Sequence, residues 1–343
     1  MKAMILNQIT SLDANNEPLT AVEVPIPEPG TGEILIQVSV CGVCHTELDE
    51  IEGRTAPPQL PVIPGHQVVG SVFQNGPEAT KFQIGDRVGV AWIFSACGRC
   101  DFCQAGLENL CPSFKATGRD VNGGYADFIV VPENFVFPLP VGISDQQAAP
   151  LLCAGAIGYR SLQLTGLQNG QTLGLTGFGA SAHLVLQLAK FLFPQSLIFV
   201  FARSESERLY ALSLGATWAG NIQDNPPTPL NAIIDSTPAW LPIVFALKFL
   251  KPSGRLVINA IRKEETDKDV LSQLDYPQML WLEKEIKSVA NITRQDVINF
   301  LDLAARIPIT PEIQLYSLAQ ANLALQELKR GKIRGAKVLV VQE

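Results

Sequence analysis

Short apolar runs with polar interruptions dominate the first 150 residues of the chain. Gly- and Pro-rich segments such as PIPEPGTGE and PPQLPVIPG separate them. This punctuation predicts a β-rich, barrel-like domain whose loops carry the polar groups. The predicted strands are KAMIL at 2–6, EILIQVSV at 33–40, HQVVGSVF at 66–73, DRVGVAWI at 86–93 and YADFIVV at 125–131.

The pattern changes at about residue 155 to alternating strands and helices. This alternation predicts a parallel sheet flanked by helices. Its strands are QTLGLT at 171–176, SLIFVFAR at 196–203, NAIIDST at 231–237 and GRLVINA at 254–260, and its helices are ASAHLVLQLAKFL at 180–192, SESERLYALSLGA at 204–216 and one through IVFALKFL at 243–250. From about 292 a tail follows, with helices at 296–307 and 318–331 and a closing strand at 336–342.

Composition narrows the functional classes. A chain of 343 residues suggests two domains, and 47% apolar residues suffice for two buried cores. A net charge of -7 argues against a nucleic-acid surface, because polyanion binding needs basic patches. The longest apolar run, 191–202, is too short to span a bilayer, and a strand-like segment directly follows Met1 where a secretory signal would stand. We therefore expect a cytoplasmic protein without membrane contact.

Four cysteines form the most specific chemical pattern. Cys97, Cys100, Cys103 and Cys111 read C-x2-C-x2-C-x7-C. Four thiolates this close together suit one tetrahedral structural zinc. A disulfide pair is the alternative in an oxidising compartment, and spacing alone leaves an iron–sulfur cluster open.

A second metal site is suggested by the remaining metal-binding side chains, which are Cys41, Cys44, Cys153, His45, His66 and His183. Cys44, His66 and Cys153 together would offer two thiolates and one imidazole with a fourth position open. This is a ligand set of catalytic zinc. An isolated buried cysteine is more often a small apolar residue of the core. Only the three residues taken together therefore indicate a metal site.

The order of these motifs resembles a known family. CGVCHTEL, then PGHQVVG, then the four-cysteine segment and a glycine turn are similar to the zinc-containing medium-chain alcohol dehydrogenases. The segment SVANITR and the C-terminal pattern are closest to the cinnamyl-alcohol-dehydrogenase-like branch. The resemblance implies that Cys44 binds the catalytic zinc, that Cys41 is a buried structural thiol, and that each chain holds two zinc ions.

The resemblance also implies the domain plan. A GroES-like β-barrel catalytic domain would comprise residues 1–154 and 292–343. A Rossmann-type, doubly wound coenzyme domain would comprise residues 155–291.

Roles near the metal follow from the same resemblance. Thr46 would accept the proton of the alcohol, although a threonine here could instead cap the following helix. Glu47 would orient the zinc-bound imidazole. Asp49 stands where many relatives end the proton relay in a histidine, and Gln67 replaces the family's usual glutamate. Trp92 would line the substrate pocket, or simply pack in the core.

The coenzyme site is predicted from Gly177-Phe178-Gly179-Ala180-Ser181-Ala182, which follows a strand and opens a helix. Gly177 allows the tight turn, Gly179 lets the backbone approach a pyrophosphate, and Ala182 permits close helix packing. Ser181 either donates to a phosphate or only begins the helix. His45 and Arg334 match family positions that face the pyrophosphate, and His183 is expected to pack.

Coenzyme choice depends on the end of the second strand. An acid there binds the ribose 2′-hydroxyl of NAD, but this chain has Ala202, followed by Arg203 and Ser204. Arg203 would pair with a 2′-phosphate, assisted by Ser204 and Arg208. We therefore expect NADP(H) to be preferred and NAD(H) to remain possible, unless Glu205 or Glu207 reaches the ribose.

The sequence thus predicts a zinc-dependent alcohol dehydrogenase or aldehyde reductase that acts on primary alcohols as a homodimer or homotetramer. The alternatives are a polyol or amino-alcohol dehydrogenase and a non-catalytic, zinc-stabilised relative.

Overall fold

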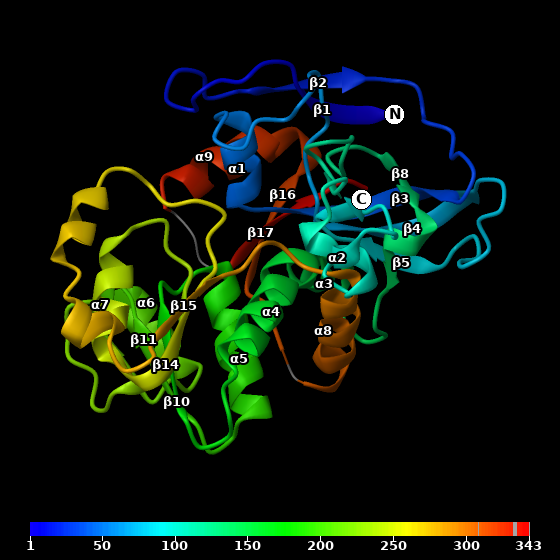
Figure 1. Ribbon diagram of the computed structural model, residues 1–343. Coiled ribbons are helices and arrows are strands. Elements are labelled where there is room, and N and C mark those ends of the chain that lie inside the picture. Colours follow the sequence, from blue (N-terminus) through cyan, green and yellow to red (C-terminus); the bar gives the residue numbers. More distant parts are fainter. Residues whose placement is uncertain (308, 332–334, 343) are drawn as a thin grey trace. The chain divides into compact units, whose positions relative to one another are not determined.

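The computed structural model describes residues 1–307, 309–331 and 335–342, and the chain divides into two compact units. The first unit comprises Met1–Ala156 and Asn291–Glu343, and the second comprises Ile157–Ala290 (Figure 1). Within the described ranges, no helix is both long and apolar enough to cross a bilayer.

Strands dominate the first unit. Its main sheet has the order β16-β17-β3-β4-β5-β9, and β8 pairs with β3 outside this path. Two smaller sheets pair β1 with β2 and β6 with β7. The strands are β1 (Lys2–Leu6), β2 (Leu19–Glu23), β3 (Glu33–Val43), β4 (Val68–Asn75), β5 (Arg87–Val90), β6 (Ile93–Ser95), β7 (Lys115–Ala116), β8 (Phe128–Pro132), β9 (Val136–Pro138), β16 (Ile313–Ser317) and β17 (Ala336–Val340).

The central strand β3 leads to the predicted zinc ligands. Its sequence, EILIQVSVCGV, is almost entirely buried because β4, β8 and β17 all pair with it. Cys41 pairs with Val68 of β4 in the antiparallel register. This register brings the end of β3, just before Cys44, next to the segment that carries His66.

The helices of the first unit are short, except α8. They are α1 (His45–Ile51), α2 (Asp101–Gln104), α3 (Asp145–Pro150), α8 (Arg294–Arg306) and α9 (Ala321–Lys329). α3 continues directly into a π-helical segment, Leu151–Gly155. Such segments are rare and often occur at functional sites.

The second unit is a six-stranded parallel sheet with the order β12-β11-β10-β13-β14-β15. The strand order reverses at β10, and open α/β sheets bind ligands at such a switch point. Its strands are β10 (Thr172–Thr176), β11 (Leu197–Phe201), β12 (Trp218–Gly220), β13 (Leu230–Asp235), β14 (Leu250–Ile258) and β15 (Glu285–Ser288), and its helices are α4 (Ala156–Thr165), α5 (Ala180–Leu192), α6 (Glu205–Ser213) and α7 (Leu241–Phe249).

Aromatic side chains fill part of the core of the second unit. Phe201 stacks on Phe249 with ring centroids 5.6 Å apart, and Trp218 packs edge-on against Phe201 at 5.2 Å. These offset and T-shaped arrangements are the favoured aromatic geometries. The stacked pair joins the end of β11 to the end of α7.

The predicted combination of a β-rich unit and a parallel α/β unit is confirmed. The sequence pattern missed β2, β7, β9, β12, β15 and β16. For β15 and β16 the reason lies in the exposure of their side chains. All four residues of β15 are exposed, and β16 has mostly exposed side chains, so neither strand shows an apolar alternation.

Candidate active site

Three elements of the first unit bring the predicted catalytic ligands together. Cys44 follows β3 and caps α1, His66 precedes β4, and Cys153 lies in the π-helical segment. The Cys44 Sγ and His66 Nε2 atoms are 3.6 Å apart. The donor atoms of all three residues lie within 4.8 Å of one another.

This spacing suits a single zinc ion. Zn–S and Zn–N bonds meeting at a tetrahedral angle place the two donor atoms about 3.6 Å apart. The distance between Cys44 and His66 has this value. The donor set therefore fits zinc, with three protein ligands and room for a fourth from solvent or substrate.

Glu47 supports two sides of this cluster at once. Its Oε1 lies 2.5 Å from Nδ1 of His66, and its Oε2 accepts the backbone N–H of Cys44 at 2.8 Å. Glu47 and His66 are both buried. With Nδ1 held by the carboxylate, Nε2 is the nitrogen that faces the two thiols.

Burial and the neighbouring thiol make the ionisation of this cluster costly unless a cation is present. The hydrogen bond to Cys153 and then burial raise the pKa of Cys44 well above its ordinary value. A divalent cation offsets the cost of burying two thiolates side by side, because it supplies the opposite charge at bonding distance.

The first turn of α1 carries the other predicted residues near the metal. Thr46 is partly buried, and its backbone N–H donates to Cys44 Sγ at 3.4 Å. His45 is exposed. Asp49 is buried and forms an ion pair with Arg54, with 2.5 Å between its Oδ1 and the guanidinium Nε. An arginine therefore accompanies the carboxylate for which we predicted a proton-relay role.

Gln67 and Cys41 pack behind the ligands. The side-chain oxygen of Gln67 lies 2.6 Å from the place where a Cβ at residue 42 would stand, so only glycine fits at Gly42. Burial raises the pKa of the Cys41 thiol. Both residues are buried, which agrees with the structural role expected of Cys41, and the role expected of Gln67 near the metal stays a prediction.

Trp92 lies beside His66, one of the predicted metal ligands. Its ring meets His66 edge-on with centroids 6.4 Å apart, and it is tilted against Phe114 at 5.7 Å. The indole therefore forms one wall next to the imidazole.

Sequence reasoning missed Glu50, which lies one helical turn beyond Glu47 and is only 1% exposed. Burial and then the charge of Glu47 raise the pKa of Glu50, while the Trp92 indole N–H opposes this shift. Among the described residues, neither Glu50 oxygen nor the Trp92 indole nitrogen makes a hydrogen bond of standard geometry. The available signal was a pair of acids at i and i+3 on one helix face.

The four-cysteine lobe, residues 97–111, forms a second cluster in the first unit. The Sγ atoms of Cys97, Cys100, Cys103 and Cys111 lie within 4.8 Å of one another, and all four are free thiols. Cys97 and Cys103 Sγ are 3.9 Å apart. The edge of a tetrahedral zinc–sulfur site is about 3.8 Å, so this lobe also fits one zinc ion.

Backbone amides prepare these thiols for a cation. The N–H groups of Arg99 and Cys100 lower the pKa of Cys97 to about 6. Burial and then the hydrogen bond to Cys100 raise the pKa of Cys103 to about 12. One thiolate thus forms easily and its neighbour does not, so full ionisation of the cluster needs a positive ion.

In the second unit, the glycine turn joins β10 to α5 as predicted. Gly177 has a φ of +78°, and a Cβ there would stand 2.9 Å from Thr237 Cγ2. A Cβ at Gly179 would meet nothing within 4 Å, and this residue caps α5 without a side-chain hydrogen bond. The turn therefore leaves open space beside the first amides of α5, where a phosphate could approach.

The remaining residues of this motif form the first turn of α5. The Ser181 hydroxyl lies 3.4 Å from the Asn259 side-chain amide, and Ala180 is partly buried. Ala182 and His183 are buried, and the His183 ring lies against Tyr210. Arg334 lies outside the described residues.

At the end of β11, Ala202 is buried and Arg203 is exposed. Ser204 caps α6 by accepting the Glu207 N–H at 3.2 Å, and Glu207 accepts the Ser204 N–H at 3.4 Å. Arg208 Nη1 donates to the carbonyl oxygens of Ala202 and Arg203, both at 2.9 Å. Glu207 thus caps the start of α6, and Arg208 stabilises the backbone at the end of β11 through two hydrogen bonds.

A buried charge network beside the glycine turn was also missed. Asp235 ends β13 with no exposure, and its carboxylate accepts the hydroxyls of Thr176 at 2.5 Å and Thr237 at 2.8 Å. Lys263 forms an ion pair with it and donates to the Thr237 carbonyl at 2.7 Å. The network fixes the residues against which Gly177 packs, and an acid ending a buried parallel strand was its only sequence signal.

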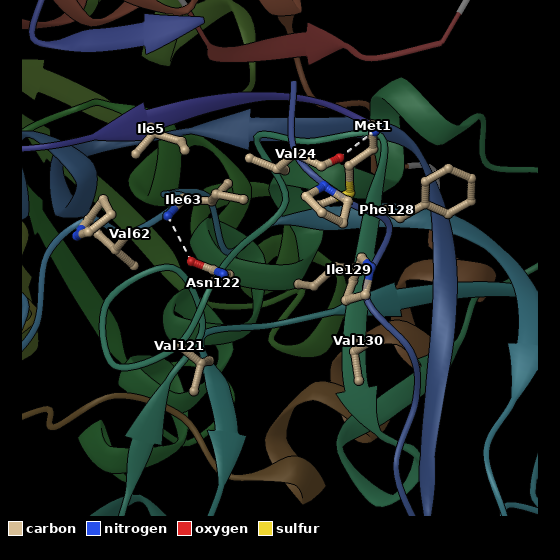
Figure 2. A pocket seen from close by; sticks show the side chains of 13 residues that line it. Met1, Ile5, Val24, Val62, Ile63, Val121, Asn122, Phe128, Ile129 and Val130 are labelled. Carbon is tan, nitrogen blue, oxygen red and sulfur yellow. Dashed lines mark hydrogen bonds between the residues drawn. The ribbon is translucent and has the colours of Figure 1, made fainter. Parts of the chain in front are cut away.

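An apolar pocket of about 300 Å³ lies elsewhere in the first unit, between residues of β1 and β8 (Figure 2). Asn122, its only polar side chain, accepts the Ile63 N–H at 3.0 Å. None of the predicted site residues that the structure describes lines this pocket. It therefore has no part in the predicted chemistry.

Comparison with known proteins agrees with this arrangement. Residues 30–141 match the alcohol dehydrogenase GroES-like domain. The chain is 43% identical over 329 residues to the probable alcohol dehydrogenase AdhA of Mycobacterium tuberculosis, covering 94% of this chain and 93% of that one. It is 31% identical over 354 residues to an alcohol dehydrogenase of Geobacillus stearothermophilus, covering both completely. The structure is similar to a cinnamyl alcohol dehydrogenase of Sorghum bicolor, with a TM-score of 0.86, 28% identity and coverage of 99% and 97%.

A GroES-like unit with two clusters of possible metal ligands and a Rossmann-type unit together define an oxidoreductase of the two-domain dehydrogenase class. Within that class, this chain belongs to the zinc-containing medium-chain alcohol dehydrogenase family, with cinnamyl alcohol dehydrogenases among its structural neighbours. The predicted alcohol dehydrogenase or aldehyde reductase function is thereby confirmed at the level of the family.

Proposed function

We propose that this chain interconverts primary alcohols and aldehydes at the Cys44/His66/Cys153 site and prefers NADP(H) to NAD(H). The observation that carries the proposed chemistry is the set of three donors within 4.8 Å of one another, in which Cys44 Sγ and His66 Nε2 are 3.6 Å apart, as two ligands of one zinc ion are. When bound, zinc supplies Lewis acidity toward the substrate oxygen, and the nicotinamide coenzyme accepts or donates the hydride.

The residues around the donors then have separate tasks. Glu47 keeps the His66 imidazole oriented through Nδ1. The Thr46 hydroxyl accepts the proton of the alcohol and passes it on. Asp49, paired with Arg54, is the candidate acceptor further along, and Trp92 forms the pocket wall beside His66.

The coenzyme would lie at the carboxyl ends of the parallel strands. The first amides of α5, beyond Gly179, would bind the pyrophosphate. At the end of β11, the Arg203 guanidinium would pair with the 2′-phosphate. The capping role of Glu207 supports this choice, because that acid is already hydrogen-bonded within α6.

The coenzyme test is kcat/KM for both coenzymes in wild type and in Ala202→Asp/Arg203→Ile. We expect wild type to favour NADP(H) and the double variant to favour NAD(H), since the variant removes the cation at residue 203 and adds a carboxylate at residue 202 that repels the 2′-phosphate. A wild type that favours NAD(H), or an unmoved preference in the variant, would contradict this assignment.

The substrate class is tested with benzyl alcohol, a polyol and an amino alcohol in the oxidation direction, and with benzaldehyde in the reduction direction. We expect the primary alcohol and the aldehyde to be turned over fastest. Preference for the polyol or the amino alcohol would favour the alternative branch. No turnover by zinc-loaded protein would favour a non-catalytic role.

We also propose a homodimer formed through β15. This strand is the edge of its sheet, and its four side chains are exposed. Two antiparallel copies centred on Ile286 would place Glu285 opposite Lys287 in both directions. Ile286→Lys should therefore yield monomers in light scattering, and an unchanged oligomer would exclude this edge as the interface.

A further inference from the structure

An ion pair in the first unit joins the four-cysteine lobe to α8. Glu108, between Cys103 and Cys111, accepts the backbone N–H of Arg294 at 2.7 Å. Its other oxygen accepts Nε at 2.9 Å and Nη2 at 2.7 Å of the same arginine. The Arg294 guanidinium also lies 4.6 Å from the centre of the Phe135 ring. Because Nε also donates to the first oxygen at 3.0 Å, the pair is bidentate, and it holds the lobe strongly to the first residue of α8.

Further along, α8 packs on the segment that carries Cys153. Its buried face consists of Val297, Phe300, Leu301 and Ala304, and Phe300 has no exposure. A Cβ at Gly155 would stand 2.2 Å from Cε1 of Phe300. The phenyl ring therefore rests directly on the backbone two residues after Cys153. In Figure 1, α8 extends from the lobe that carries α2.

The π-helical segment is held from its other side as well. Leu152 fills the space that a side chain at Gly89 of β5 would take, with its Cδ2 2.8 Å from that Cβ position. A π-helical turn is intrinsically less favourable than an α-helical one, so it persists only where packing enforces it. Leu152 and Phe300 supply that packing on either side of Cys153.

We propose that α8 is a positioning element for the metal ligand Cys153, and that Glu108, Arg294 and Phe300 are its positioning residues. The lobe anchors the start of α8 through Glu108, and α8 presses Phe300 onto Gly155. A metal bound in the lobe would thereby help to keep Cys153 in place at the other proposed site. This inference depends on the proposed metal-binding role of Cys153.

The test compares three variants of the zinc-loaded protein. Phe300→Leu removes the ring contact on Gly155, and Glu108→Gln removes the charge of the lobe anchor while keeping its shape. Asp302→Asn is the matched control, because its ion pair with Arg306 lies on the exposed face of the same helix. The release of each zinc to a competing dye is followed over time, and the phase of the Cys44/His66/Cys153 site is assigned by its absence in Cys44→Ser.

We expect Phe300→Leu to accelerate release from that site about tenfold, as loss of an outer supporting contact typically does, with release from the lobe unchanged. Glu108→Gln should accelerate the same phase by a smaller factor, and Asp302→Asn should leave both phases as in wild type. In the double variant Phe300→Leu/Glu108→Gln, the release rate should rise by less than the product of the two single factors, because both substitutions act through α8. The visible spectrum of the cobalt-substituted site should shift in Phe300→Leu and not in the control.

Unchanged release from the Cys44/His66/Cys153 site in Phe300→Leu and Glu108→Gln would overturn the proposal while leaving the proposed function intact. Acceleration confined to the lobe phase in Glu108→Gln would also overturn it. If every phase of zinc release in wild type is also present in Cys44→Ser, the proposed metal site is wrong. The positioning role would then be wrong as well.

Discussion

The four-cysteine lobe and the Cys44/His66/Cys153 cluster belong to the same unit but are assembled in opposite ways. The lobe takes all its donors from fifteen consecutive residues, 97–111, and its own backbone amides lower the pKa of Cys97. The other cluster takes its donors from three elements spread over residues 44–153, and a buried carboxylate, Glu47, supports it. One site is a property of a short segment, whereas the other is a property of the whole fold.

This difference predicts different roles. A site built locally can hold its segment together, and in that case metal binding contributes folding energy directly. A site with three protein ligands, an open position and a supporting acid is arranged to act on a bound molecule. Substitutions in the two clusters should therefore separate stability from turnover.

The largest effect is expected for His66→Ala. Removing this ligand should lower kcat by about a thousandfold or more, because a Lewis acid supplies several kcal/mol of transition-state stabilisation. Thermal unfolding should shift little, since the lobe stays intact. Steady-state kinetics and a melting curve on one preparation check both statements. Appreciable turnover in this variant would contradict the catalytic role of the Cys44/His66/Cys153 cluster.

Cys111→Ser should mainly reduce stability rather than turnover. Loss of one lobe thiolate should lower the free energy of unfolding by several kcal/mol, with the remaining folded protein still turning over. Urea unfolding and activity per folded molecule measure the two quantities. A variant as stable as wild type but inactive would mean that the roles of the two clusters are reversed.

A smaller effect is expected for Asp49→Ala. If Asp49 takes the proton onward, alcohol oxidation should slow by about a hundredfold or less near neutral pH and recover partly at high pH, where hydroxide substitutes. Arg54→Gln is the control, because it keeps the carboxylate and removes its ion-pair partner. If the pH–rate profile of Asp49→Ala matches that of wild type, Asp49 takes no part in proton transfer and only forms its ion pair with Arg54.

The smallest effect concerns Glu52, at the end of the helix that begins after Cys44. Burial opposes its ionisation, but hydrogen bonds from Lys329 and Arg54 lower the pKa of Glu52 from 4.5 to about 2. A depressed carboxyl pKa stabilises the fold above about pH 4.5, and this contribution disappears as the pH falls toward 2.

Glu52→Gln should therefore reduce the free energy of unfolding by on the order of 1–2 kcal/mol near pH 6, a figure lowered for the partial exposure of its partners. The difference from wild type should shrink between pH 4.5 and 2. Unfolding curves at several pH values measure it, and a difference that is constant with pH would exclude the ionised form of Glu52 as the cause.

The contrast between the two clusters also explains what the sequence could reveal. The lobe and the glycine turn are local patterns whose spacing is set by coordination and phosphate geometry, so Cys97–Cys111 and Gly177–Gly179 could be read directly. The other cluster could be proposed only as a set, because Cys153 is 109 positions from Cys44 (153 − 44) and has no local pattern.

Long-range polar contacts could not be read in advance. Arg294 and Glu108 are 186 positions apart, and neither has a sequence context that distinguishes it from an ordinary exposed charge. Lys263 and Asp235 meet only because the parallel sheet places the loops after β13 and β14 at one edge. Glu50 is buried only because other elements cover the helix face that it shares with Glu47.

Native mass spectrometry of wild type, Cys44→Ser and Cys111→Ser, each purified without added zinc, tests the proposed difference between the two clusters most directly. We expect two zinc ions per chain in wild type. We expect one in folded Cys44→Ser, which should be inactive, and loss of the lobe zinc in Cys111→Ser, with reduced stability. A reproducible single zinc in active wild type, or a Cys44→Ser variant that keeps two, would contradict the division between a local folding site and an assembled catalytic site.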